Sequence, residues 1–424
     1  MKRNSIFVVA TVLLVAFTGC SVHLSDVGVS WHGDLTCATN LARTVEIPAD
    51  LKKLELDNCF GAVHITGSDH GPAHWSWNLT VRARTDAVAQ QIANAVKCET
   101  SLADGRLKIV VSAPESREPH SIESNFEIVV PKSAGVDSRN HFGRTEITSL
   151  DGEVEACDQN GDVEIRDVKS QVQARTSFAR LTISDTGPAT LHNQNGEITA
   201  LRIEGPLQAD TSFGSLAAQD IHGQAHLGNQ NGEIKATTIR GALEANTSFG
   251  SLIARDIAGP AHLRDQMGKI ELTQAKGNAD LKTSFDRLSV EAVEGDAILR
   301  NQNGEIAASG VTGSVQASTS FGKMEISGAG PTFLCHNQNG EISLRATSVA
   351  VTSIDATTSF GSLELHLPSA VRPALQARTS FGDVQSDFPI LTKSPSGNSS
   401  PDAGTATLRA SLQNQNGNIR IFRD

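Results

Sequence analysis

The sequence predicts an all-β fold, a single-stranded β-solenoid (parallel β-helix-like) with coils of about 18 residues in a 36-residue alternating repeat. Three observations predict it. Two short motifs recur at a fixed interval, apolar residues alternate with polar ones, and glycines recur where a coil must turn. The composition agrees, because 38% of the residues are hydrophobic but only 4% are aromatic and none is Tyr. Ala, Val, Leu and Ile suit the narrow interior of so short a coil.

The repeat is defined by the motifs Thr-Ser-Phe-Gly and Asn-Gln-Asn-Gly, the second usually followed by Glu. The phenylalanines of the first motif and its variants are 35 or 36 residues apart: Phe142, Phe178, Phe213, Phe249, Phe285 and Phe321. The second asparagine of the other motif lies 17 or 18 residues after such a phenylalanine. The repeat therefore contains two coils of alternating type, and no helical period runs through it.

Each coil is expected to contain two short strands. Leu216 and Ala218 alternate with polar residues, as do Ala225 and Leu227, and a glycine marks the turn between these two segments. Two strands of this length cannot bury their apolar face alone, so the coils are expected to stack about 4.8 Å apart. Residues 136–388 give room for about 14 coils.

The two motifs are equivalent in the repeat, so phenylalanine and asparagine are expected to alternate in one structural corner of the solenoid. The residues of this corner are Phe213, Asn231, Phe249, Asn303, Phe321 and Asn339. We expect the rings to fill the corner and the asparagine amides to bond backbone groups that the turn leaves unpaired. The following glycine, such as Gly232 or Gly250, is expected to take a positive φ.

Regions of different composition flank the repeats. Residues 40–135 lack the motifs and contain strand patterns and one amphipathic helix at about 86–97 with Asp86 as N-cap, so this region is expected to cap the stack. Residues 389–404 form a Pro/Ser/Gly loop, and residues 405–424 are expected to be a terminal coil that pairs as the last rung. No asparagine motif separates Phe360 from Phe381, so the alternation is expected to slip there.

Residues 1–19 have the form of a lipoprotein signal peptide. A positive start, an apolar run over residues 6–17 and small residues before Cys20 resemble a bacterial lipobox. This pattern predicts lipidation of Cys20 and a tether over residues 20–39 that holds the protein to a membrane. An aspartate directly after Cys20 would resemble an inner-membrane retention signal. This position is Ser21, which favours the outer membrane of the cell envelope. An ordinary secreted protein is the alternative.

The remaining cysteines and the histidines predict no metal site and no cofactor. A disulfide among Cys37, Cys59 and Cys98 is plausible in an exported protein, and the sequence leaves the pairing open. Two further cysteines in the repeats are expected to behave as small hydrophobic residues: Cys157 and Cys335. The pair His70 and His74 would need a helix to bind one metal, but Gly71-Pro72 lies between them.

Charge and motifs argue against several classes of function. A net charge of −11 opposes binding of nucleic acid. Carboxylates recur with the repeat in a candidate surface column: Glu197, Glu233, Glu305 and Glu341. A periodic column has no unique catalytic site, and neither a nucleophile elbow nor a phosphate-binding glycine loop occurs, so we expect no catalytic residue. The glutamates are expected to be solvated, with a column that binds a cation or a glycan as the alternative.

The lipobox, the strand-rich start with one helix, and the short strands after glycine corners (Gly-Glu-Ile and Gly-Ser-Leu) resemble a bacterial domain-of-unknown-function family. That family is described as putative adhesin and is related to the head domains of autotransporter adhesins. The resemblance covers about residues 40–424 and implies a β-solenoid in a surface or envelope protein. It supplies no established catalytic or binding residue.

These observations together predict a non-catalytic, lipid-anchored envelope protein with an adhesive or structural role. Its expected partners are a membrane through Cys20 and a glycan or an envelope or matrix protein, with self-association also open. A self-assembling envelope scaffold is the first alternative, and a β-helix polysaccharide lyase or hydrolase is the second. An ice-binding role would need a threonine array on every coil, whereas the threonines of the motif recur on alternate coils.

Overall fold

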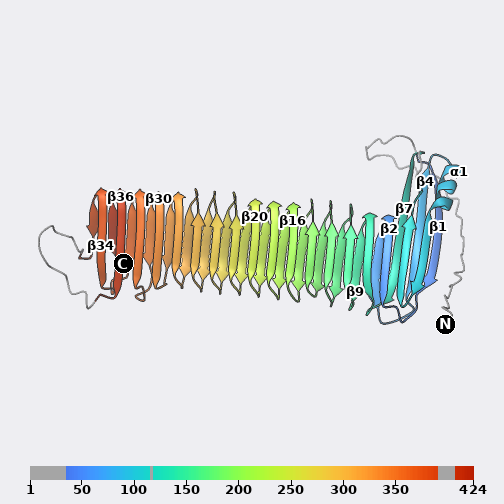
Figure 1. The fold of residues 1–424 in the computed structure, drawn as a ribbon, viewed down its shortest axis with the longest axis horizontal. Coiled ribbons are helices and arrows are strands. Elements are labelled where there is room, and N and C mark those ends of the chain that lie inside the picture. Colours follow the sequence, from blue (N-terminus) through green and yellow to red (C-terminus); the bar gives the residue numbers. More distant parts are fainter. Residues whose placement is uncertain (1–34, 115–117, 390–405) are drawn as a thin grey trace. The chain divides into compact units, whose positions relative to one another are not determined.

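The computed structural model describes residues 35–114, 118–389 and 406–424. The expected signal peptide, Cys20 and nearly all of the Pro/Ser/Gly loop lie outside these residues. The described chain is a β-solenoid of about 13 turns with 65% strand and 3% helix, which confirms the predicted fold class. Each coil gives one strand to each of two parallel sheets, as the stacked arrows of Figure 1 show. None of the described helices is long and apolar enough to cross a membrane.

The chain forms two compact units, residues 1–199 and residues 200–424. In the second unit one sheet contains β16 (Leu207–Phe213), β18 (Ala225–Asn231), β20 (Leu243–Phe249), β22 (Ala261–Asp265), β24 (Ala279–Thr283), β26 (Ala297–Asn301), β28 (Val315–Phe321), β30 (Thr332–Asn339), β32 (Ser353–Phe360), β36 (Leu408–Asn416) and β34 (Pro373–Phe381). The other sheet contains β17 (Leu216–Ile221), β19 (Ile234–Ile239), β21 (Leu252–Ile257), β23 (Ile270–Ala275), β25 (Leu288–Val293), β27 (Ile306–Val311), β29 (Met324–Gly328), β31 (Ile342–Ala346), β33 (Leu363–Leu367), β37 (Ile419–Arg423) and β35 (Val384–Ser386).

The first unit has the same two-sheet plan with an antiparallel extension. One sheet contains β1 (Cys37–Glu46), β4 (His74–Ala83), β7 (His120–Pro131), β3 (Val63–Ser68), β9 (Thr145–Leu150), β11 (Val163–Val168) and β13 (Leu181–Thr186). The other contains β5 (Lys97–Ala103), β6 (Arg106–Ser112), β2 (Lys53–Phe60), β8 (Gly135–Phe142), β10 (Val154–Asp158), β12 (Val172–Thr176) and β14 (Ala189–Asn193). Strand β15 (Ile198–Ile203) spans the boundary between the units.

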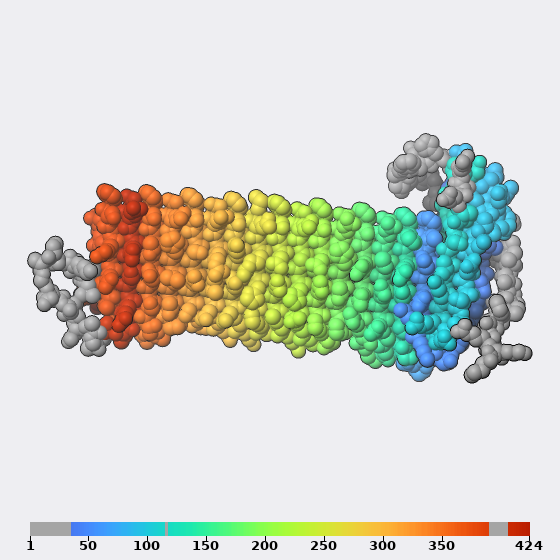
Figure 2. All heavy atoms as spheres, in the orientation of Figure 1, coloured from blue at the N-terminus to red at the C-terminus, as the bar shows by residue number. Residues whose placement is uncertain are grey.

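The last coil of the sequence is not the last coil in space. Strand β36 pairs with β32 on one side and with β34 on the other, and β37 lies in the same way between β33 and β35. Figure 2 shows this inserted coil as a dark red band with orange on both sides. The expectation that residues 405–424 form the terminal rung is therefore wrong, because the chain passes one rung further with β34 and β35 before it returns.

The N-terminal region contains a similar insertion. Strands β2 and β3 form a parallel coil that lies between the coil of β6 and β7 and the coil of β8 and β9. Residues expected only to cap the stack thus belong to it, while β1, β4 and β5 add antiparallel strands beyond it. Helix α1 (Asp86–Ala95) contacts β1 and β4. Its N-cap is Thr85, whose Oγ1 accepts a hydrogen bond from the Val88 N–H, and not Asp86 as predicted.

The interior is filled in two ways. In one part of the stack large and small residues alternate, since Leu243 lies between Ala225 and Ala261. Elsewhere like residues stack in register, as Leu263, Leu281 and Leu299 do. All of these side chains are almost completely buried, so the interior is closely packed.

The corner differs from the prediction in which residue points inward. Phe213, Asn231 and Phe249 do align on successive coils, but the rings of Phe213 and Phe249 are 52% and 54% exposed. The prediction that phenylalanine fills the corner is wrong, because the inward position is occupied two residues earlier by Asn229 or Thr247. Beyond this position the chain bends, and the ring lies outside the last interior residue.

Inward asparagine and threonine side chains form a corner ladder that ties most coils to the coil before them, although the buried Thr247 hydroxyl has no partner in the described chain. The Asn229 Nδ2 donates to the Gly214 carbonyl at 2.9 Å, and the Thr283 Oγ1 donates to the Gly268 carbonyl at 2.9 Å. Further steps of 2.7–3.0 Å are made by Asn301, Thr319, Asn337, Thr358, Asn414 and Thr379. An asparagine amide therefore bonds the backbone as expected, but the asparagine is the first of the motif and not the second. The second, Asn231, makes only a 3.5 Å bond to the Ser212 carbonyl.

Glycine is required at the corner because successive coils approach closely there. A Cβ on Gly232 would lie 1.9 Å from the Gly214 carbonyl oxygen, and a Cβ on Gly250 would lie 2.1 Å from the Gly232 oxygen. Gly232 and Gly250 are not in the left-handed region, so the prediction of a positive φ is wrong for them. It is correct for Gly214, whose φ is 121°.

A second column of left-handed residues, one per coil, lies near the end of the other strand and was not predicted. These residues have φ of 52–61° and recur every 17 or 18 residues: Ser149, Asp167, Asp185, Arg202, Asp220, Thr238, Asp256, Gln274 and Ala292. Each is left out of the pairing, as Thr238 is between Thr237 and Ile239. This one-residue bulge places two outward residues in succession and so returns Ile239 to the interior.

Two tryptophans of β4 pack in the interior of the first unit. Trp75 and Trp77 are 1% and 7% exposed and lie 6.2 and 6.4 Å from the Phe126 ring. The Trp77 Nε1 donates to the Ser124 Oγ at 2.7 Å.

The corner ladder predicts a difference between the two asparagines of one motif. Asn229→Leu should destabilise the protein by about 1–3 kcal/mol, because it removes the buried donor to Gly214 and leaves that carbonyl unpaired. Asn231→Leu, the matched control two residues away, should cost clearly less. Urea denaturation of both variants measures the difference, and equal losses would contradict the assignment of the ladder to Asn229.

The bulge column predicts a stabilising substitution. Thr238→Gly should raise the free energy of unfolding by about 1 kcal/mol, because a β-branched residue is strained at a φ of 56° and glycine is not. Thr237→Gly is the control, since Thr237 is extended and paired with Gln219 and Arg255, and it should destabilise by a similar amount. If the melting temperature shifted in the same direction for both variants, the inferred backbone strain at Thr238 would be contradicted.

Candidate functional site: an exposed aromatic corner

The strongest surface feature of the second unit is a row of exposed phenylalanines, one on every second coil. The rings are 46–73% exposed: Phe213, Phe249, Phe285, Phe321, Phe360 and Phe381. The positions between them in the row are held by Asn231, Met267, Asn303, Asn339 and Asn416. We call these residues together the aromatic corner. Soluble proteins rarely leave so many large apolar side chains exposed in one line, so the row is a candidate binding surface.

The alternation persists where the sequence repeat fails. Phe360 and Phe381 lack an intervening motif in the sequence, but Asn416 of the inserted coil pairs with both of them. The expected slip is therefore absent in space, because the returning chain supplies the missing asparagine rung.

Free amides surround the rings. The side chains of Gln230, Gln302 and Gln338 are exposed, and those of Asn303 and Asn339 lie beside them. Within the described parts of the chain, none of these five amides forms a hydrogen bond to another residue. Each amide thus keeps one carbonyl acceptor and two N–H donors for a ligand.

The glutamate column runs next to the aromatic corner and is charge-balanced. Glu197 lies 3.5 Å from Arg180, Glu233 accepts a hydrogen bond from the Ser251 Oγ at 3.1 Å, and Glu341 lies 3.9 Å from Lys323. Serine, lysine or arginine occupies the coils between the glutamates, so no carboxylate stands directly above another. Among the described residues, no group of three or more His, Cys, Asp or Glu could hold a metal ion.

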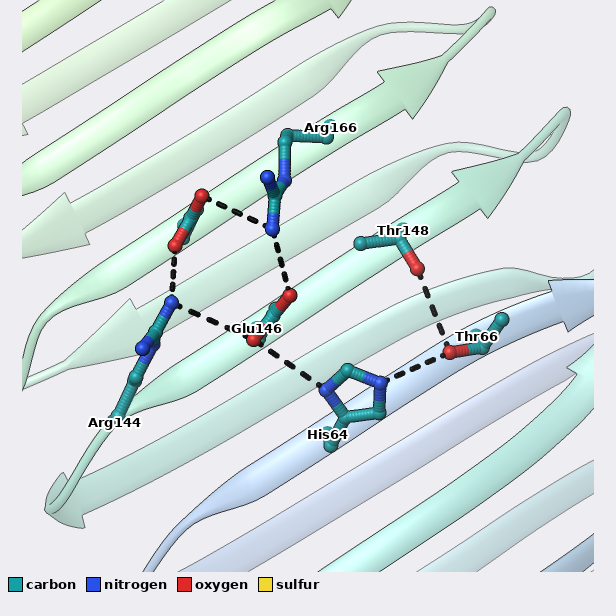
Figure 3. A network of polar contacts seen from close by, with 7 residues as sticks. His64, Thr66, Arg144, Glu146, Thr148 and Arg166 are labelled. Carbon is teal, nitrogen blue, oxygen red and sulfur yellow. Dashed lines mark hydrogen bonds and ion pairs between the residues drawn. The ribbon is translucent and has the colours of Figure 1, made fainter.

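The first unit carries a different polar feature, an ion-pair network across three coils (Figure 3). Glu146 on β9 contacts Arg166 at 2.8 Å, Arg144 at 3.5 Å and His64 at 3.5 Å. Glu164 on β11 accepts from both arginines. The charges balance within the network, and half of the groups are exposed, so its effect is to tie β3, β9 and β11 together rather than to form a reactive centre.

The histidines singled out in the sequence do not converge. The His74 Nδ1 lies 3.0 Å from the Pro72 carbonyl, and the backbone of His70 bonds the Ser68 hydroxyl. The five described cysteines are all free thiols, so the suggested disulfide among Cys37, Cys59 and Cys98 does not form. Cys335 is buried as predicted, but Cys157 is exposed because it occupies an outward position of β10.

A groove on the other sheet of the second unit was not visible in the sequence. It has a volume of about 660 Å³ and lies over β21 to β31. Small outward residues form its floor, such as Ser289, Ala307 and Ser327, and longer charged residues of both signs form its walls. Its mixed charge selects no particular ligand.

Two buried carboxylates interrupt the corner ladder. Asp158 and Asp265 occupy inward positions that other coils give to asparagine or threonine, and they are 2% and 5% exposed. Burial raises the pKa of Asp158 to about 6, and burial also raises the pKa of Asp265. The Asp265 Oδ2 has no hydrogen-bond partner in the described chain, because an ionised carboxylate has no proton to donate to a neighbouring carbonyl.

Comparison with known proteins gives distant structural matches. No family model and no curated protein matches the chain. A putative cell adhesion protein from Clostridium sporogenes is 9% identical, with 91% of this chain and 100% of that chain covered and a TM-score of 0.15. A putative adhesin from Bacteroides fragilis is 12% identical, with 90% and 97% covered and a TM-score of 0.18. A putative lipid binding protein from Parabacteroides distasonis is 13% identical, with the same coverage and a TM-score of 0.16. At these scores the function must be argued from the surface of this chain itself.

The buried carboxylates predict a pH-dependent stability. Because the folded state binds the Asp158 proton more tightly than the unfolded state does, the contribution of Asp158 to stability is greatest below about pH 4 and is lost as the pH rises through about 6. Asp158→Asn should therefore stabilise the protein by about 1–3 kcal/mol at pH 8 and by little at pH 4. Glu155→Gln removes an exposed carboxylate from the same strand and should give no such gain. Urea titrations at the two pH values test this, and a gain that is equal at both would contradict it.

Proposed function

We propose that this protein is a non-catalytic, lipid-anchored adhesin of the bacterial cell envelope that binds its partner along the aromatic corner. The single observation that carries the proposal is the row of phenylalanines that are 46–73% exposed at every second coil. A ring that is half exposed contributes little to folding, since the interior ends two residues earlier, so packing does not account for it. Binding to a partner does.

The repetition of the row suits a multivalent contact. Each rung offers one ring or one amide group, and a single such contact is weak. Several equivalent contacts along one ligand add to a strong and reversible attachment. This use of many equal rungs differs from catalysis, which needs one site unlike the rest.

The anchor comes from the sequence. Lipid on Cys20 would hold the N-terminal end of the chain at a membrane, and the outer membrane is the membrane that Ser21 favours. The repeats would then lie C-terminal to the attachment point, where a ligand outside the membrane could reach them.

Replacement of the exposed rings tests the proposal. The probe is a glycan and matrix-protein array, and the protein is the chain from Ser21 onwards, which retains every described residue. A variant with Phe213, Phe249, Phe285 and Phe321 changed to Ser should lose at least tenfold in affinity while its melting temperature stays within a few degrees, because the rings are exposed.

The double variant Glu233→Ala/Glu305→Ala is the matched surface control and should bind as the unchanged protein does. Loss of binding in this control alone would move the site to the glutamate column. Binding that survives in the serine variant would contradict a role for the aromatic corner. If nothing on the array binds and electron microscopy shows concentration-dependent rods, the protein is an envelope scaffold instead.

A further inference from the structure

The alternation of exposed rings and amides along the aromatic corner limits the class of ligand that can bind there. This inference rests on the proposed adhesive function. Two coils separate one ring from the next, so the rings are spaced about 9.6 Å apart along the row. The rung between two rings carries a glutamine and usually an asparagine, such as Gln302 and Asn303 between Phe285 and Phe321. The rung between Phe249 and Phe285 keeps the glutamine, Gln266, but has Met267 in place of the asparagine. A ligand that uses the whole row must therefore offer an apolar face at every second unit and hydrogen-bonding groups at the units between.

From this geometry we propose that the aromatic corner binds a linear, neutral, β-1,4-linked polysaccharide that lies along the row. Successive pyranose rings in such a chain are turned over, so the same ring face recurs at every second sugar. Two sugar units extend about as far as two coils. One C–H face can then stack on each phenylalanine, and the hydroxyl groups of the intervening sugar can meet the free amides of Asn303 or Asn339.

The charge of the surface supports a neutral glycan. The rings and amides of the aromatic corner carry no charge, and in the adjacent column the glutamates alternate with residues such as Lys269, Arg287 and Lys323. The row therefore offers no charge of one sign for a charged ligand, and the net charge of −11 on the whole chain disfavours a polyanion. A neutral chain with many hydroxyl groups is the better complement.

A second copy of the protein fits the row less well. Two copies offset by one coil could interleave their rings, but each ring would then cover the amides of an opposite rung. Those amides have no partner within the described chain, and a facing phenylalanine offers none, so their burial would cost hydrogen bonds to water. A sugar chain supplies the partners that a second row of rings lacks.

The inserted C-terminal coil agrees with a role for the alternation in space. The inserted coil fits the interior of its neighbours, with Ala410 between Ile354 and Leu375. Interior packing does not determine which residue stands at an outward position. Asn416 nevertheless stands between Phe360 and Phe381, so the row continues through the point at which the sequence repeat is broken.

Calorimetric titration with hexasaccharides tests the inference. Cellohexaose and chitohexaose should bind the chain from Ser21 onwards, and maltohexaose, with its α-1,4 links and curved shape, should bind at least tenfold more weakly. Affinity should rise in steps of two sugars as the oligosaccharide lengthens. Phe285→Ser should weaken binding about two- to tenfold, and Phe285→Trp should restore it.

Two sources of such a chain are distinguished with insoluble material. Pull-down by peptidoglycan sacculi but not by cellulose or chitin would point to the glycan strands of the cell's own envelope, and the reverse would point to an external polysaccharide. Equal binding of cellohexaose and maltohexaose, or binding that Phe285→Ser leaves unchanged, would overturn the inference.

Failure of the glycan inference can be told from failure of the adhesive proposal. If array proteins bind in a manner that depends on the four rings while no β-1,4-linked sugar binds, the adhesin proposal stands and the ligand class is wrong. If no partner binds and the protein self-associates through the rings, as shown by ultracentrifugation of the serine variant, both are wrong.

Discussion

The structure depends on one hydrogen bond, from an inward side chain at the corner of one coil to a backbone carbonyl at the corner of the coil before it. Chain turns leave polar backbone groups unpaired, and a solenoid repeats this deficit on every rung. Asn229 and Thr283 show the two solutions, an amide and a hydroxyl of similar reach. The corner glycine of the donating coil, such as Gly232, must lack a side chain, because its Cβ would lie 1.9 Å from the Gly214 carbonyl oxygen of the coil before it.

The same bond holds at both insertions, where the chain order and the spatial order differ. Asn414 of the inserted C-terminal coil donates to the Gly361 carbonyl, and Thr379 of the outermost rung donates to the Gly417 carbonyl. At the other end, Asn140 donates to the Gly61 carbonyl of the inserted coil of β2 and β3. The ladder thus follows neighbours in space. The C-terminal coil of β36 and β37 is held between two other coils, so it cannot detach without the loss of pairing on both sides.

Two positions of one short motif have different roles, one in the fold and one at the surface. The first position of Asn-Gln-Asn or Thr-Ser-Phe faces inward and stabilises the coil, and the third faces outward and is free to meet a partner. A repeat protein can therefore keep its fold and its surface in the same few residues. The alternation of rings and amides imposes a period of two coils on whatever binds, which is a more specific demand than a uniform apolar stripe would make.

The sequence alone determined the coil length, the two-strand coil, the equivalence of the two motifs and the helix near residue 90, since all of these follow from local spacing and from a period of two. It misassigned Phe249 to the interior because simple alternation was extended past the point where the chain bends. The bulge at Thr238 was missed for a related reason. Aspartate, which tolerates a positive φ, recurs at this position, as in Asp220 and Asp256, but several other coils carry residues without that preference, and only the pairing of neighbouring coils shows the extra residue. The tertiary structure decided which coils lie next to each other at the two ends. That order depends on pairing between segments far apart in the chain, such as β36 between β32 and β34. The spacing of motifs along the sequence does not indicate it.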